Sequence, residues 1–151
     1  MLVSEDYEFL VFLLRERPVL FPRKEAYDFN DGFRPQHRQC QLTAIHLFQS
    51  QGLDMISGIC WLDVHGKLYP WPHVVNLQGD ELVDYSHGIA EPSFGFSPMT
   101  NDEVEQRFNR ITAAYDIEEF DDRVKPGWGD PLAQLLSDEW YVRLRDNAGR
   151  R

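Results

Sequence analysis

The sequence predicts a single α+β domain spanning residues 1–151. Segments with apolar residues at helical spacing flank three strand-like segments that are separated by turn residues. At 151 residues the chain has the usual length of one domain, and no shift in composition marks a domain boundary. With 42% hydrophobic residues, among them 4 Trp, 6 Tyr and 10 Phe, it can bury a substantial core.

The N-terminal segment predicts one helix followed by a long loop. Ser4 is a suitable cap for a helix of about ten residues, and Pro18 lies beyond its end. Apolar residues recur on one face of this helix at Phe9, Leu10, Leu13 and Leu14. Residues 19–34 show no clear period and contain Pro22 and Gly32, so we expect a loop that lies over the core.

The middle of the chain predicts a second helix and then three antiparallel strands. Pro35 suits the first turn of the helix, and Gly52 ends it. Its apolar face would consist of Cys40, Ala44, Leu47 and Phe48. The strands are expected over residues 55–64, 67–77 and 81–85, with Gln78–Gly79 as the second turn. Because proline lacks a backbone N–H, Pro70 and Pro72 predict an irregular course for the middle strand before His73.

The C-terminal third predicts a loop and two flanking helices. Residues 87–98 are rich in glycine and proline, which favours a loop. Thr100 and Glu103 have the spacing of a capping box at the start of a helix. Asp130 and Pro131 are typical of the start of a last helix.

Charge and composition narrow the class of partner. The formal net charge is −10, and so acidic a surface repels phosphate backbones, which argues against nucleic acid and is compatible with a basic protein partner. No apolar run is long enough to cross a bilayer, and acidic residues stand where a signal peptide has basic ones. We therefore expect a cytoplasmic protein without a membrane association, whose cysteines, Cys40 and Cys60, are free thiols.

Two residues of the predicted hairpin form an acid–base pair. If Gln78–Gly79 is the turn, His73 and Asp84 are directly opposite each other. If Gly79–Asp80 is the turn, Asp84 becomes a diagonal neighbour on the same face. In both cases the carboxylate can fix one imidazole nitrogen as N–H and leave the other free to act as a base.

Cys40 is the candidate nucleophile for this pair. It lies early in its helix, where the helix dipole lowers a thiol pKa and backbone N–H groups can stabilise an oxyanion. A thiol, an imidazole and a carboxylate together suggest a cysteine nucleophile, its base and the group that orients the base. The alternative is that Cys40 and His73 are buried structural residues and Asp84 a solvated strand end.

The order of these motifs resembles the transglutaminase-like branch of the papain-like cysteine enzymes. The similar features are C-x-x-x-A in the helix, then M-I-S-G-I-C-W, P-H-V-V and V-D-Y-S, and they resemble most a group of small uncharacterised bacterial and phage proteins. The resemblance covers about a third of the chain. It implies Cys40 as nucleophile, His73 as general base, Asp84 as the group that orients the base, and a Cys-bearing helix packed on a small antiparallel sheet.

Further residues are candidates for supporting roles. Gln36 and Gln39 precede Cys40, as does the oxyanion-hole glutamine of papain-like enzymes. Trp61 and Trp71 can wall a substrate cleft or pack in the core. Cys60 stands in mid-strand and is a poor candidate for the nucleophile. The five histidines and two cysteines lack the spacing of a metal site, and no phosphate-binding loop is present, so we expect no cofactor.

Two functions follow as hypotheses. The first is a thiol-dependent acyltransferase or amide hydrolase acting on a protein or peptide, with the family resemblance making deamidation or transamidation of glutamine one option. The second is a catalytically inactive acidic binding module, such as a phage- or plasmid-borne inhibitor of a basic partner. The two differ in the expected reactivity of Cys40.

Overall fold

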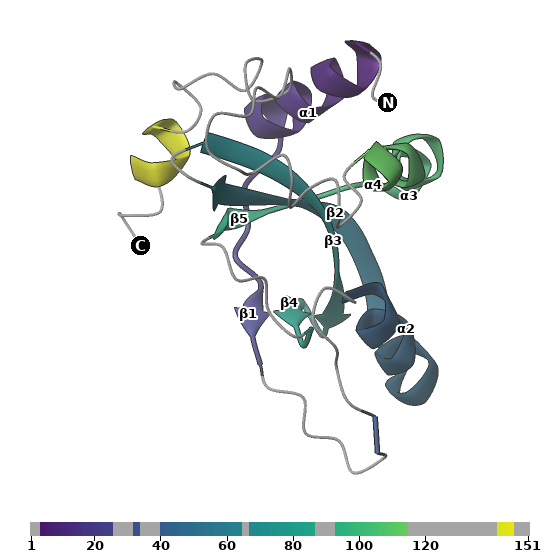
Figure 1. Ribbon diagram of the computed structural model, residues 1–151. Helices are drawn as coiled ribbons and strands as arrows, with labels where there is room; N and C mark the ends of the chain where they lie inside the picture. The colour runs from purple at the N-terminus through teal and green to yellow at the C-terminus, as the bar shows by residue number, and fades with distance from the viewer. Residues whose placement is uncertain are drawn as a thin grey trace.

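The chain folds as a mixed α+β structure around a curled five-stranded sheet (Figure 1). The computed structural model describes residues 4–25, 32–33, 40–64, 67–86, 93–114 and 142–146. The elements are α1 (Ser4–Glu16), β1 (Arg23–Lys24), α2 (Cys40–Gln51), β2 (Asp54–Val64), β3 (Lys67–Gln78), β4 (Glu81–Asp84), β5 (Ser93–Pro98), α3 (Asn101–Glu103), the π-helix η1 (Val104–Phe108) and α4 (Asn109–Ala114).

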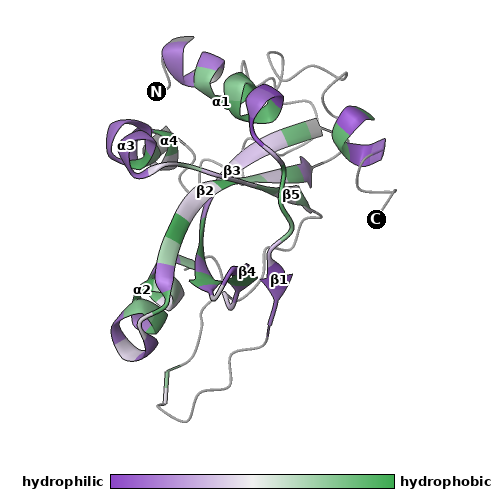
Figure 2. Ribbon diagram, turned by 180° about the vertical axis from the view of Figure 1, so that it is seen from behind, coloured by the Kyte–Doolittle hydropathy of each residue, from purple (hydrophilic) through white to green (hydrophobic). Residues whose placement is uncertain are grey.

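The sheet has the order β1-β4-β3-β2-β5, with the long β2–β3 hairpin at its centre. Apolar residues occur along both central strands, whereas β1 is hydrophilic (Figure 2). In Figure 1, α1 and α2 lie at opposite ends of this hairpin. Each helix therefore covers a different part of the sheet, and α2 lies beside the end that pairs with β4.

The apolar face predicted for the first helix and the helix start predicted at Thr100 are confirmed. All four apolar residues predicted for α1 are buried, and Thr100 and Glu103 form the expected capping box. Gly52 ends α2 at a φ of 70°, with its N–H bonded to the carbonyl of Phe48. Ala44 and Leu47 of α2 are buried as predicted. Phe48 was expected there too, but it is exposed, because Thr43 fills the buried face instead.

Two segments predicted as loops contain strands. Arg23–Lys24 pairs in parallel with β4, and Leu20 forms an isolated bridge with Phe96. Ser93–Pro98 pairs antiparallel with β2, and the register shifts between Trp61 and Leu62. The prolines and glycines of these segments favour a loop in the local sequence pattern. The strands form nevertheless, because they pair with segments that are distant in sequence. Residues 26–31, 34 and 87–92 of the two predicted loops lie outside the described residues.

The middle strand is regular throughout, which corrects the expected irregularity before His73. β3 keeps one continuous register with β2 from Lys67 to Gln78. Successive residues of a strand direct their N–H groups to alternate sides of the strand. Pro70 and Pro72 are two residues apart and have no N–H, so both missing donors are on the same side of β3. Within the described residues β4 pairs with β3 only over 76–78, so neither proline removes a bond from the β3–β4 ladder.

Several other predictions fall on parts of the chain that the structure does not describe. These are the helix start at Pro35, the candidates Gln36 and Gln39, and the helix start at Asp130. Within the described ranges, residues 142–146 are helical and Leu144 is buried in the core. No helix in the described ranges combines the length and apolarity that a bilayer crossing requires.

Candidate functional site: a thiol, an imidazole and a carboxylate

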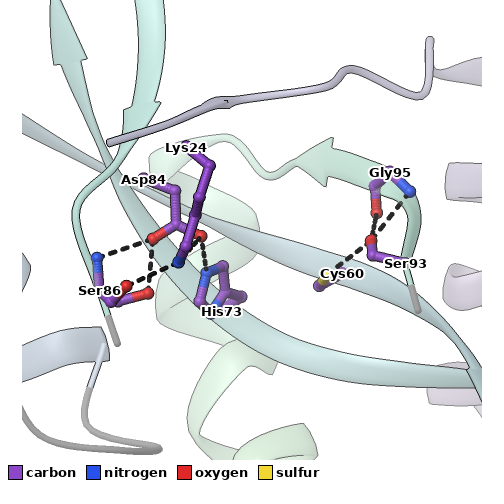
Figure 3. A network of polar contacts seen from close by, with 7 residues as sticks. All are labelled: Lys24, Cys60, His73, Asp84, Ser86, Ser93 and Gly95. Carbon is purple, nitrogen blue, oxygen red and sulfur yellow. Dashed lines mark hydrogen bonds and ion pairs between the residues drawn. The ribbon is translucent and has the colours of Figure 1, made fainter. Parts of the chain in front are cut away.

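Asp84 and His73 share one face of the sheet and are joined directly (Figure 3). The pairing of Gln78 with Glu81 makes Gly79–Asp80 the turn, so Asp84 is a diagonal neighbour of His73. The directly opposite pairing expected from a Gln78–Gly79 turn is therefore wrong, and the second of the two predicted registers is the observed one. His73 Nε2 lies 2.9 Å from Asp84 Oδ2. The shift of two residues changes the pairing but keeps both side chains on one face.

The carboxylate of Asp84 is held through both of its oxygens. Oδ1 accepts hydrogen bonds from the backbone N–H of Ser86 at 2.9 Å and from its hydroxyl at 2.5 Å. Oδ2 faces His73 and also forms an ion pair with Lys24 at 3.4 Å (Figure 3). Burial alone would raise the pKa of this carboxyl, but the bond to His73 and the charges nearby hold the pKa well below its ordinary value.

Cys40 interacts with the same imidazole ring. It is the first residue of α2, which packs on β3 through a bond from Asn76 Nδ2 to the carbonyl of Ala44 at 3.1 Å. Asn76 and His73 lie on opposite faces of β3, and Cys40 interacts with the backbone of Val74 between them, which places the thiol at the edge of the strand. That edge is accessible because β4 has already ended at Asp84.

The thiol and the ring shift each other's titration. Burial alone would raise the pKa of Cys40, but its interaction with His73 and with the backbone of Val74 leaves the thiol pKa below its ordinary value. Burial alone would lower the pKa of His73, but Asp84 and Cys40 raise it well above 6.5. These opposite shifts favour a thiolate–imidazolium pair.

The second nitrogen of the ring is the reactive position in this arrangement. His73 is 4% exposed, and its Nδ1 is buried without a hydrogen bond of regular geometry to any described residue. Because Nε2 is bonded to Asp84, Nδ1 is the nitrogen left for the thiol. The sulfur and the ring are close enough to shift each other's pKa values, and no hydrogen bond of regular geometry joins them in the described residues.

Cys60 shares the face of His73 but lies in a different environment. Its sulfur is 3.1 Å from the hydroxyl of Ser93, which also accepts from the N–H of Gly95 (Figure 3). Burial raises the pKa of the Cys60 thiol. The two cysteines thus have pKa values shifted in opposite directions, and only that of Cys40 favours a thiolate.

The two tryptophans lie in the core. Trp61 is completely buried and donates its indole N–H to the Ser97 hydroxyl at 2.8 Å, and Trp71 is also buried. Their burial favours core packing, which is one of the two uses that the sequence allowed for both tryptophans. In the described ranges no three His, Cys, Asp or Glu side chains are grouped so as to hold a metal ion.

Phe96 and Lys24 are parts of the site that the sequence did not indicate. The Phe96 ring meets His73 edge-on at 6.4 Å and covers Gly58, where a Cβ would lie 2.6 Å from Phe96 Cζ. Lys24 reaches the site only through the pairing of β1 with β4. No local sequence signal marks either contact, because both depend on strand pairing between distant segments.

Comparison of the chain with family models, curated proteins and solved structures gives no match.

Proposed function

We propose that the chain is a thiol-dependent acyltransferase or amide hydrolase with a transglutaminase-like, papain-like core. The supporting observation is the position of the His73 ring, with Nε2 bonded to Asp84, a buried Nδ1 that has no regular hydrogen bond within the described residues, and Cys40 close enough to interact with the ring. Each group has the pKa direction that its role requires: a thiol shifted down, an imidazole shifted up and a carboxylate that stays ionised.

The reaction would proceed in two steps. The thiolate of Cys40 attacks the carbonyl carbon of an amide or thioester, a C–S bond forms, and the carbonyl π electrons move to oxygen. When the tetrahedral intermediate collapses, the bond to the leaving group breaks and His73 gives it the proton. Water or an amine, deprotonated by His73, then attacks the thioester and releases Cys40 as the thiolate.

Preorganisation would assist both steps. Asp84 keeps the ring oriented and stabilises its protonated form, and two donors from Ser86 keep Asp84 oriented. The backbone N–H at the start of α2 is a candidate donor to the oxyanion. A glutamine side chain of a protein or peptide is the substrate class implied by the family resemblance, which would make the reaction deamidation or transamidation.

The test is the relative reactivity of the two thiols. We expect limiting iodoacetamide at about pH 6.5 to alkylate Cys40 at least about tenfold faster than Cys60, because the thiolate is the reacting species. Cys60→Ala and Cys40→Ser provide matched single-thiol proteins, and peptide mass spectrometry assigns the label. His73→Gln should slow Cys40 to the rate of an ordinary thiol, with near-UV circular dichroism confirming the fold.

An activated acyl ester tests the chemistry itself. We expect a mass adduct on Cys40 that turns over in the wild-type protein and does not form in Cys40→Ser. Two slow and similar thiols, with no adduct, would contradict the enzyme and would favour the acidic binding module instead.

A further inference from the structure

The strand β1 brings a cation to the candidate site. In the parallel register of β1 and β4, Lys24 and Asp84 are Cα partners. The ammonium of Lys24 donates to the carbonyl of Ser86 at 2.6 Å and lies 3.4 Å from Asp84 Oδ2. It therefore contacts both the carboxylate and the backbone of the residue that holds the other carboxylate oxygen (Figure 3).

These contacts form a closed network. Ser86 donates twice to Asp84 Oδ1, Lys24 donates to the Ser86 carbonyl, and the Lys24 charge faces Oδ2. The Lys24 bond thereby connects the residue Ser86, which follows β4, to β1. The backbone N–H of Glu25 also donates a hydrogen bond of 3.1 Å to the Asp84 carbonyl. A carboxylate fixed at both oxygens and through its own backbone has little freedom to turn away from His73.

We propose that Lys24 is a positioning residue that keeps the Asp84 carboxylate aimed at His73 Nε2. The proposal rests on the proposed function of Cys40, His73 and Asp84, and it adds a residue to that site. Lys24 contacts neither the thiol nor the nitrogen that faces it, so its action would pass through Asp84 and Ser86.

The charge of Lys24 predicts the direction in which the pH profile of Cys40 alkylation shifts when this charge is removed. Within the described residues, the ionisable groups facing the His73–Asp84 pair are Cys40 of α2, Cys60 of β2 and Lys24 of β1. A cation beside the carboxylate opposes protonation of the imidazole and favours a thiolate. Loss of the Lys24 charge should therefore move both limbs of the pH profile for Cys40 alkylation to higher pH.

The experiment compares Lys24→Met, Lys24→Arg and Arg23→Met. Arg23 is a matched control on the same strand, because its partners are Glu25 and Glu81 and not Asp84. We expect Lys24→Met to slow Cys40 alkylation by about tenfold, less than the roughly hundredfold that a 1 Å misplacement can cost. Both limbs of its pH profile should rise, Lys24→Arg should restore most of the rate, and Arg23→Met should behave as wild type.

A second readout is independent of thiol chemistry. The Nε2–H proton of His73 should give a slowly exchanging downfield signal in the proton NMR spectrum, which Lys24→Met weakens or shifts and Arg23→Met leaves in place. If Lys24→Met matches Arg23→Met in both readouts, the positioning role is wrong. If wild-type Cys40 is no faster than Cys60, the proposed function fails, whereas the ring signal still decides the role of Lys24.

Discussion

The substitution Asp84→Asn tests the central pair while keeping the size of the side chain. In the wild-type protein both carboxylate oxygens accept: Oδ1 from two donors of Ser86 and Oδ2 from His73, beside Lys24. An asparagine has one oxygen and one NH₂ group. If the amide oxygen stays with Ser86, the NH₂ group faces the Lys24 ammonium, and Nε2 of His73 must become an acceptor with the ring proton on Nδ1. If the amide is reversed, the NH₂ group meets the two donors of Ser86, so hydrogen bonds of the wild-type site are lost in either orientation.

The structure sets the size of the effect. Hydrogen bonds to charged groups each contribute about 1.5–3 kcal/mol, and removing one member of a buried charged pair costs about 3–5 kcal/mol. The Asp84 side chain is 16% exposed, so we expect a loss at the lower end of that range. We expect Asp84→Asn to lower the free energy of unfolding by about 3 kcal/mol at about pH 6.

The pH dependence follows from the two pKa shifts. The pKa of His73 is raised on folding, so its contribution is complete below the unfolded value of about 6.5 and is lost as pH rises through the folded pKa. The pKa of Asp84 is lowered, so its contribution is complete above about pH 4 and is lost as pH falls through the folded pKa. The cost of Asp84→Asn should therefore be largest between about pH 4 and about pH 6.5, and should decline as pH rises from there through the raised pKa of His73.

Urea unfolding from about pH 3 to about pH 10, followed by circular dichroism, measures this profile. Glu81→Gln is the control, because Glu81 lies on the same strand in a surface ion pair with Arg23 and should cost less than about 1 kcal/mol. If Asp84→Asn costs no more than Glu81→Gln at every pH, the His73–Asp84 pair does not stabilise the fold as we reason.

Three further substitutions test other contacts by urea unfolding. Gly58→Ala should lower the free energy of unfolding by about 1–3 kcal/mol, because the new Cβ would meet Ser97 O at 2.3 Å and displace Phe96. It should also slow the alkylation of Cys40. An unchanged urea midpoint would refute this. Asp6→Asn should cost about 3–5 kcal/mol, since Asp6 is fully buried against two arginines at 2.6 and 3.2 Å, and a cost under 1 kcal/mol would contradict that. Thr100→Ala removes a helix cap and should cost about 1 kcal/mol, whereas no loss would mean that the cap is dispensable.

Local patterns in the sequence were sufficient for the buried face of α1, the start of α3 and the central hairpin. The apolar spacing that includes Leu13 predicts the buried face of α1, and Thr100 with Glu103 predicts the start of α3, because these signals act within one or two turns. The face shared by His73 and Asp84 was also predictable. The two possible turns differ by two residues in register, and a shift of two leaves both side chains on the same face.

Strands held by distant partners could not be predicted in this way. β1 has two charged residues and no alternation, and it is a strand because β4 lies beside it. β5 contains Gly95 at a φ of 127°, which in a sequence favours a turn, whereas in the fold it accommodates the close approach of Val19 and Leu20. The positions of Lys24 beside Asp84 and of Phe96 beside His73 depend on these two strands, so they could not be predicted either.

The contrast between the two thiols shows why residue type alone does not define the site. Cys40 and Cys60 both lie near His73, and burial alone would raise the pKa of each. For Cys40 the imidazole outweighs burial, because the thiol stands at the first residue of α2, at the edge of β3 that β4 leaves free. For Cys60, in mid-strand and bonded to Ser93, burial prevails. The short length of β4 is therefore as much a part of the candidate site as its three side chains, since a longer β4 would occupy the edge of β3 where the thiol meets the ring.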